Sequence, residues 1–555
     1  MTGTTSGWWR TATVYQVYPR SFADSDGDGV GDLRGLIGRL DHLAALGIDV
    51  VWLSPVYPSP QDDNGYDISD YYDIDPLFGT LADFDELLAE AHARGLRVVM
   101  DLVVNHTSDE HPWFVESRDP ASPKHDWYWW RPEPNNWGSR FSGPAWERDE
   151  DSGEYYLHLF SRKQPDLNWE NPELRREVHR MMRWWLDRGV DGFRMDVVNF
   201  IAKPVALPDA PMAPGDLYGD AESLYANGPR LHEFLQEMHR EVFAGREDRL
   251  LTVGETPGTS VAQARLLTDP ARRELDMVFQ FDHVELDQGR DKWDELPFDL
   301  VALKRTLARW QTGLAEAGWN SLYWNNHDQP RIVSRWGDDG AYRELSAKLL
   351  ATVLHLHRGT PYVYQGEELG MTNVPFASID DFADIQSRNH YFEATERRGQ
   401  PASDVLAALR SRSRDNARTP MQWDASPNAG FTTGTPWLRV NPNFTSVNAA
   451  AQVGDPASVF AHYRRLISLR HNEPLITDGR YELLLPEHPR LFAFTRTEGE
   501  RGLLVLANFS GSPLDVPAVD GWVGAGLVLG NYPDSAEVLG EQVRLRPWEA
   551  LVLRR

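Results

Sequence analysis

Residues 81–106 read LADFDELLAEAHARGLRVVMDLVVNH, a helical pattern followed directly by a β-rich, apolar run. The run ends in a polar pair, Asn105 and His106. A helix that leads into a parallel strand is the repeating unit of α/β proteins, and barrels of this class place their chemistry where the strands end. This unit therefore predicts a parallel sheet and the edge of that sheet at which a site would lie.

The same alternation of helical and β-rich runs continues along most of the chain. Eight β-rich runs lie at residues 13–19, 48–55, 96–106, 192–195, 251–254, 277–281, 321–325 and 361–365. Eight parallel strands joined by helical crossovers close into a barrel. We therefore expect an α/β protein with a (β/α)8 TIM barrel.

Two segments depart from the barrel pattern. Residues 106–174, after the third strand, are rich in Trp, Pro and Asn, and a connection this long is usually functional or a small subdomain. From residue 479 onward, short strands separated by turn residues predict an antiparallel β-sandwich domain. The expected division is a catalytic barrel over residues 1–105 and 175–478, an inserted subdomain over 106–174 and a C-terminal domain over 479–555.

Charge and composition narrow the class of partner. The 555 residues include 56 basic and 83 acidic side chains, a net charge of −27. This balance argues against nucleic acid or an anionic membrane and favours neutral or cationic ligands. The chain has no cysteine, which excludes a disulfide scaffold and thiolate chemistry. The first twenty residues contain no apolar run of signal-peptide or membrane-span length, so we expect a cytoplasmic protein, monomeric or weakly homo-oligomeric.

Three carboxylates follow three different predicted strands: Asp196, Glu255 and Asp328. Cleavage of a glycosidic bond requires one carboxylic acid to protonate the leaving oxygen and a second, ionised group to attack or to activate water. Arg194 lies two residues before Asp196, on the same face of the strand, so we expect it to keep Asp196 ionised. Glu255 follows an apolar strand, where loss of solvent should raise its pKa toward that of a proton donor.

Each of these residues also has a structural interpretation. A single acidic residue at a strand end can form a salt bridge or cap a helix, so the argument rests on three of them converging. His106 and His327 also follow strands, but neither has a neighbouring ligand at metal-binding spacing. Each histidine could donate a hydrogen bond to a substrate hydroxyl, and a purely structural role is the alternative.

The stretch DSDGDGVGD, residues 24–32, has the spacing of a calcium loop. The expected ligands are Asp24, Asp26, Asp28, the Val30 carbonyl and Asp32, with Gly29 at the turn. Position 12 of the loop is Gly35 in place of the usual bidentate Glu, so a single structural cation outside a helix–loop–helix is predicted. Calcium and magnesium both fit, a solvated acidic turn is the alternative, and no organic cofactor is expected.

Several motifs occur together in a fixed order. DLVVNH, GFRMD, VGE and NNHDQ resemble the four signature regions of the α-amylase family, glycoside hydrolase family 13. QDDNGYDISDYY, QPDLNWENP and RDNARTPMQWD are similar to motifs of its oligo-1,6-glucosidase and α-glucosidase branch. The resemblance covers essentially the whole chain.

The resemblance implies a retaining hydrolase acting on small oligosaccharides or disaccharides. Asp196 would be the nucleophile, Glu255 the general acid/base and Asp328 the residue that holds the sugar hydroxyls, with Arg194 orienting Asp196. The pocket for the terminal glucose would be lined by Asp63, Tyr66, His106, Phe160, Gln164, His327 and Arg414. The cation site of this branch would correspond to Asp24, Asp26, Asp28, the Val30 carbonyl and Asp32.

Substrate preference depends on the closed end of the pocket and on the residues that follow the catalytic carboxylates. A pocket closed by Asp63 and Arg414 would give exo action, and valine after the nucleophile, Val197, goes with α-1,6 activity in similar enzymes. Thr256 follows Glu255 at a position where methionine is common in the branch, and this departure affects the preference for the aglycone. An α-1,4-glucosidase or a sucrose-acting hydrolase or transglucosidase is therefore the alternative. Sucrose isomerases carry an arginine-rich loop where this chain has HVELDQGRDKWDE, and related transporter subunits lack the catalytic carboxylates.

Overall fold

The computed structural model describes residues 7–517, 519–535 and 537–555, and its centre is an eight-stranded parallel sheet. The strands are β1 (Val14–Val17), β2 (Val50–Leu53), β3 (Arg97–Val103), β7 (Gly192–Asp196), β8 (Leu251–Glu255), β9 (Met277–Phe279), β10 (Ser321–Leu322) and β11 (Thr360–Tyr364). Their order is β10-β11-β1-β2-β3-β7-β8-β9, and a parallel bridge between Val278 and Asn320 joins the two ends. The predicted barrel and its eight strands are confirmed.

The register of the strands brings their carboxyl ends together. Val103 in β3 pairs with Asp196 in β7, and Glu255 at the end of β8 pairs with Phe279 in β9. Below this edge the barrel is filled by large apolar side chains, among them Trp52, Val99, Leu251, Val253, Met277 and Tyr362. Because the interior is packed, a substrate can reach only the polar ends of the strands.

Helices surround the barrel. They include α1 (Leu33–Ile37), α2 (Leu40–Leu46), α3 (Leu81–Ala93), α5 (Pro172–Arg188), α6 (Glu222–Tyr225), α7 (Leu231–Met238), α8 (Val261–Thr268), α9 (Leu300–Gly313), α10 (Ile332–Arg335), α11 (Arg343–His355) and α16 (Val459–Asn472). Helix α3 shows why they form: Thr80 and Asp83 make a capping box at its start, and Phe84, Leu87 and Leu88 are buried on one face.

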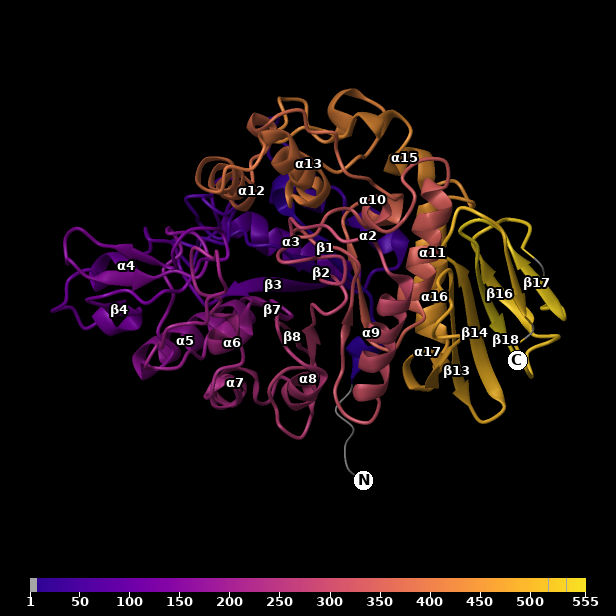
Figure 1. Ribbon diagram of the computed structural model, residues 1–555, viewed down its shortest axis with the longest axis horizontal. Helices are drawn as coiled ribbons and strands as arrows, with labels where there is room; N and C mark the ends of the chain where they lie inside the picture. Colours follow the sequence, from indigo (N-terminus) through magenta and orange to yellow (C-terminus); the bar gives the residue numbers. More distant parts are fainter. Residues whose placement is uncertain (1–6, 518, 536) are drawn as a thin grey trace.

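Two excursions rise from the strand ends and border the site. The segment between β3 and α5 contains α4 (Pro112–Ser117) and a small antiparallel sheet of β4 (Trp130–Arg131), β6 (Tyr155–Leu157) and β5 (Trp146–Arg148). After β11 the chain forms α12 (Ile385–Phe392), α13 (Ala402–Arg412), α14 (Asp415–Arg418) and α15 (Ala449–Gln452). Figure 1 shows the first excursion at one end of the molecule and the second above the barrel.

The last part of the chain is an antiparallel β structure at the opposite end of the molecule from α4 (Figure 1). After α17 (Leu475–Asp478), five strands form one sheet in the order β12 (Arg480–Leu484), β13 (Leu491–Glu498), β14 (Arg501–Asn508), β18 (Ala550–Arg554) and β16 (Gly526–Gly530). Strands β15 (Leu514–Pro517) and β17 (Gln542–Leu545) form a separate pair. The predicted antiparallel C-terminal sheet is confirmed, and the exact domain boundaries stay predictions.

Among the described residues, no helix combines the length and the apolar character that a membrane crossing requires.

Candidate active site

A cavity of about 710 Å³ opens at the carboxyl ends of the barrel strands. Eight of the residues predicted from the sequence line it: Asp63, Tyr66, His106, Phe160, Asp196, Glu255, Asp328 and Arg414. Arg194, Gln164 and His327 are outside this lining, and each contacts one or more of the lining residues. The predicted residues are therefore gathered at one place: eight line the cavity, and three lie behind them in contact with the lining.

Arg194 is the centre of the charge arrangement at the floor of the cavity. Its Nη1 lies 2.8 Å from Asp196 Oδ1 and 2.9 Å from Asp101 Oδ1, and its Nη2 lies 2.6 Å from Glu255 Oε2. The ring of Trp52 stacks against the guanidinium, with 4.9 Å between Cζ and the ring centroid. One buried cation is thus shared by three carboxylates.

Asp101 was missed by the sequence analysis. It lies in β3, and its Oδ2 accepts hydrogen bonds from Trp52 Nε1 at 3.1 Å and from the Tyr66 hydroxyl at 2.9 Å. The available signal was a carboxylate at the start of DLVVNH, inside an otherwise apolar strand. Acidic side chains are rarely buried without a partner, and the partner here is Arg194.

Burial dominates the ionisation of the two central carboxylates. Burial raises the pKa of Glu255 to about 8 against the opposing effect of Arg194, and the charges of Asp196 and Asp328 add to the rise. This agrees with the predicted proton donor. Burial also raises the pKa of Asp196 to about 7, so the expectation that Arg194 would hold this pKa low is wrong in its net direction. The reason is that loss of solvent outweighs the lowering effect of Arg194, and the negative charge of Asp101 adds to the rise.

Val197 fixes one oxygen of Glu255. Its backbone N–H donates to Glu255 Oε2 at 3.1 Å, and its side chain lies in the cavity wall. Val197 has φ 34° and ψ 42°, the left-handed region that β-branched residues rarely adopt. Such strain persists where the surrounding structure enforces it, and here it directs the N–H toward the carboxylate.

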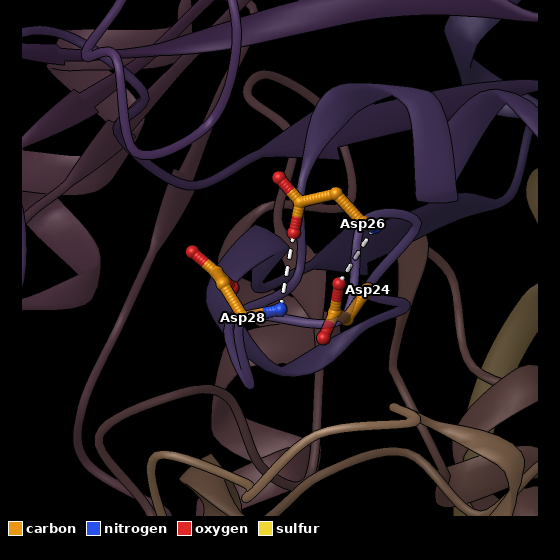
Figure 2. Close-up of side chains that lie close together, drawn as sticks. All are labelled: Asp24, Asp26 and Asp28. Carbon is orange, nitrogen blue, oxygen red and sulfur yellow. Dashed lines mark hydrogen bonds between the residues drawn. The ribbon is translucent and has the colours of Figure 1, made fainter.

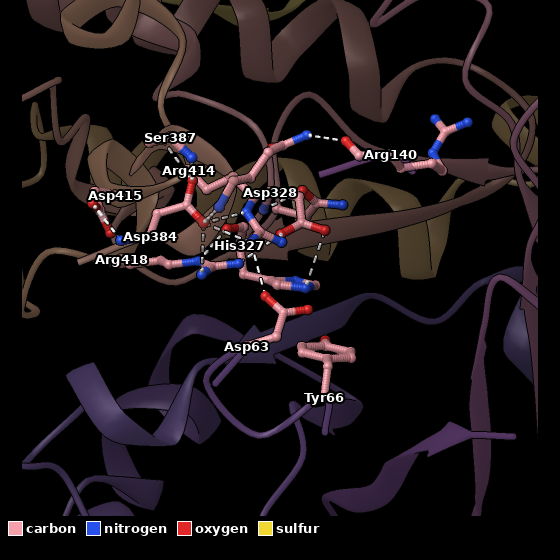
Figure 3. Close-up of polar contacts among 12 residues, drawn as sticks. Asp63, Tyr66, Arg140, His327, Asp328, Asp384, Ser387, Arg414, Asp415 and Arg418 are labelled. Atoms are coloured by element: carbon pink, nitrogen blue, oxygen red, sulfur yellow. Dashed lines mark hydrogen bonds and ion pairs between the residues drawn. The ribbon is translucent and has the colours of Figure 1, made fainter. Parts of the chain in front are cut away.

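A second charge cluster forms the other side of the cavity (Figure 3). Arg414 Nη2 lies 2.8 Å from Asp63 Oδ1, and Arg414 Nη1 lies 3.3 Å from Asp328 Oδ1. Arg418 Nη2 also approaches Asp328 Oδ1, at 2.8 Å. Burial would raise the pKa of Asp328, and the surrounding positive charge, including both arginines, reverses that shift and lowers it. Asp328 is therefore ionised throughout the neutral range.

Two members of this cluster were also missed from the sequence. Asp384 Oδ1 lies 2.6 Å from Arg414 Nη2, and Arg418 belongs to the RDNARTPMQWD stretch that supplies Arg414. Arg418 could have been found from that motif. Asp384 carries no comparable signal, because its position beside Arg414 depends on how the chain folds after β11.

The two predicted histidines, His106 and His327, are buried, and each packs against an aromatic ring. The His327 ring stacks on Tyr66 with centroids 5.0 Å apart, and its Nδ1 lies 2.8 Å from Gln16 Nε2. The His106 ring lies 5.1 Å from Phe160. Burial lowers the pKa of both histidines, to about 3 for His327, so both rings are neutral. A neutral ring can donate or accept a hydrogen bond without adding charge to the cavity.

Gln164 connects the histidine side of the cavity to the charge cluster. Its Nε2 donates to Asp63 Oδ2 at 3.1 Å and lies 3.3 Å from His106 Nε2. The amide therefore holds one oxygen of Asp63 while Arg414 holds the other.

Away from the cavity, Asp24, Asp26 and Asp28 form an acidic loop (Figure 2). One oxygen from each lies within 4.8 Å of the others, and backbone N–H groups of Gly27 and Gly29 donate to Asp24. Oxygen donors converging at this spacing fit a hard divalent cation, so the loop can hold a metal ion. Asp32, the fourth carboxylate predicted for this site, is also the N-cap of α1 and accepts a hydrogen bond from Gly35 N at 2.7 Å.

Comparison with known proteins agrees with this geometry. The sequence model of the family "Alpha amylase, catalytic domain" matches residues 16–479. The chain belongs to the α-amylase family. Within this family, an oligo-1,6-glucosidase of Parageobacillus thermoglucosidasius is 57% identical and covers 99% of both chains. The predicted oligo-1,6-glucosidase and α-glucosidase branch is confirmed.

Solved structures of family members superimpose over almost the whole chain. A trehalose-6-phosphate hydrolase variant of Bacillus licheniformis is 46% identical with a TM-score of 0.93 and covers 99% of both chains. The isomaltulose synthase of Klebsiella sp. LX3 is 41% identical with a TM-score of 0.95 and the same coverage. Members with different named reactions thus share this fold, so the choice among reactions depends on the site itself.

Proposed function

We propose that this member of the family is a retaining, exo-acting α-glucosidase that releases α-glucose from the non-reducing end of short α-glucosides and prefers α-1,6 linkages. The observation that carries the proposal is the sharing of Arg194 by Asp196 and Glu255 at the floor of the cavity. This sharing supports the proposal because double displacement requires a nucleophile and a proton donor with different proton affinities in one site.

In the first step, Glu255 donates its proton to the glycosidic oxygen while an Asp196 oxygen attacks the anomeric carbon. The aglycone leaves with that proton, and glucose becomes esterified to Asp196. In the second step, Glu255, now ionised, takes a proton from water, whose oxygen attacks the anomeric carbon and displaces Asp196. Two inversions return the α configuration.

Asp328 and Asp63 hold the hydroxyls of the terminal glucose, and Arg414 joins them. The ion pair between Asp63 and Arg414 ends the pocket behind the glucose, so a longer chain has no room beyond the non-reducing end. Tyr66, His106 and Phe160 supply the flat walls. This arrangement supports exo action on disaccharides and short oligosaccharides.

The linkage preference is supported by Val197, which lies in the cavity wall beside Glu255. The second candidate is an α-1,4-glucosidase or a sucrose-acting hydrolase or transglucosidase, because one relative is named alpha-glucosidase and the structure of another contains sucrose as its substrate. Transfer remains available to any such site, since a sugar hydroxyl can replace water in the second step.

A structural calcium or magnesium ion completes the proposal. Asp24, Asp26 and Asp28, with the Val30 carbonyl and Asp32, would hold it, and it would fasten the loop before α1 without entering the reaction. A cytoplasmic location and a monomeric or weakly associated chain stay predictions from the sequence.

The test is the initial rate of the purified enzyme on isomaltose, maltose and sucrose, with the products followed by proton NMR. Preference for isomaltose and first appearance of α-glucose support the full proposal. Preference for maltose or sucrose would retain the mechanism and reject the linkage, and first appearance of β-glucose would reject retention.

A further inference from the structure

Asp384 is a buried carboxylate that the proposed reaction does not use. It is fully buried and is outside the lining of the cavity. Its Oδ1 accepts from Arg414 Nε at 2.9 Å and Nη2 at 2.6 Å, and Arg418 Nη1 lies 3.8 Å away (Figure 3). Asp384 is thus the nearest carboxylate to Arg414.

The other oxygen of Asp384 holds the start of α12. Asp384 Oδ2 accepts from the backbone N–H of Ser387 at 3.0 Å and from its hydroxyl at 2.6 Å, which makes Asp384 the N-cap of this helix. Helix α12 contributes Gln386 and His390 to the cavity wall. The helix is tied across the cavity as well, because Asn389 Nδ2 donates to the carbonyl of Phe141 at 3.1 Å.

Asp384 therefore contacts both Arg414, which belongs to the charge cluster, and the start of α12, which forms part of the cavity wall. Through Arg414 it reaches Asp63 and Asp328, and through its capping bonds it sets the position of α12. We infer that Asp384 is a positioning residue that keeps Arg414 from binding the substrate-holding carboxylates too closely while it fixes the wall formed by α12. The inference deepens the proposed function and rests on it.

The physical reason lies in the charge on Arg414. A buried guanidinium must be compensated by nearby carboxylates. Without Asp384, only Asp63 and Asp328 remain among the carboxylates described as partners of Arg414, and the cation would be drawn onto them. Their oxygens would then be engaged by Arg414 and less able to accept hydrogen bonds from sugar hydroxyls.

A role as a helix cap alone is the competing explanation, and the chain allows the two to be separated. Asparagine and serine are good N-cap residues, so Asp384→Asn and Asp384→Ser keep the cap and remove the charge. Asp384→Ala removes both. Asp381→Asn is the matched control: this carboxylate lies three residues earlier and accepts from Ala377 N and Ser378 N within its own turn.

The experiment compares these variants with the wild-type chain in kcat and KM for isomaltose, in inhibition by free glucose, and in melting temperature. We expect D384N to fold and to melt above D384A, because it keeps the cap, while the inhibition constant of glucose and the KM rise about tenfold or more, as expected for loss of one partner of a buried charge pair. D384A should show the same defect and a lower melting temperature, and D381N should match the wild type.

Wild-type binding of glucose by D384N and D384S would reduce Asp384 to a helix cap and overturn the inference. Failure of both variants to fold would assign Asp384 to stability and overturn it as well. Absence of α-glucoside turnover by the wild-type chain would instead reject the proposed function, independently of any Asp384 variant.

Discussion

Asp101 and Asp196 share a single nitrogen, Nη1 of Arg194, at 2.9 and 2.8 Å. The two carboxylates come from neighbouring strands, β3 and β7, and Glu255 on β8 takes the other terminal nitrogen. Three acids around one cation cannot all ionise without leaving net negative charge in a buried place. Asp101 therefore affects the protonation of both catalytic residues without touching the cavity.

Asp101→Asn should move both limbs of the pH profile to lower pH. Removing this negative charge favours ionisation of Asp196 and Glu255, so each pKa falls, and the shift should be about one unit. Asp328, which also raises the pKa of Glu255, is unchanged, and the amide oxygen of asparagine can still accept a hydrogen bond from Trp52 or Tyr66. The check is kcat/KM against pH with an aryl α-glucoside, together with the melting temperature. Unmoved limbs with reduced activity would show that Asp101 is only structural.

The wild-type profile should be a narrow bell. Asp196 must be ionised, and its pKa is raised to about 7, so activity is lost as the pH falls through that value. Glu255 must be protonated, and its pKa is raised to about 8, so activity is lost as the pH rises through that value. Measurement of kcat/KM from pH 5 to 10 decides this, and a profile without a basic limb would contradict the assignment of Glu255.

Loss of the nucleophile should abolish turnover without unfolding the chain. Asp196→Ala should reduce kcat by about 10⁴-fold or more, since loss of a catalytic carboxylate in a group that acts as a unit has effects of this size. With azide and an activated α-glucoside, D196A should form β-glucosyl azide by one inversion, and E255A should form α-glucosyl azide by two. The same anomer from both variants would show that the two roles are wrongly assigned.

Substitution at Val197 should change linkage preference more than overall activity. Val197→Thr should lower the ratio of isomaltose to maltose hydrolysis by about tenfold, because a change of one methyl group in a pocket amounts to ~1–3 kcal/mol. The rate on an aryl α-glucoside, which has neither linkage, is the internal control. An unchanged ratio would move the linkage determinant to the residues around Lys292 and Gln386.

Calcium or magnesium should stabilise the fold through the acidic loop. A cation that binds only the folded state at 100 times its Kd adds about 2.7 kcal/mol to the free energy of unfolding. The melting temperature should therefore rise with added cation and fall with chelator, and the double variant D26N/D28N should lose this response. A response of the same size in the variant would place the cation elsewhere.

The sequence by itself determined the barrel and the identity of the three strand-end carboxylates. Both follow from local pattern: helical and β-rich runs alternate, and in a parallel barrel every strand ends at the same edge, so Asp196, Glu255 and Asp328 had to converge. The motifs added Asp63 and Arg414, which contact each other across 351 positions of the chain.

Only the tertiary structure decided which partners these residues have. The register between β3 and β7 places Asp101 beside Arg194, and the path of the chain after β11 places Asp384 beside Arg414. The tertiary structure also raised the pKa of Asp196, against the expectation from its neighbour Arg194. The physical reason is that charge balance and loss of solvent depend on every group within a few ångströms, and most of those groups come from distant parts of the chain.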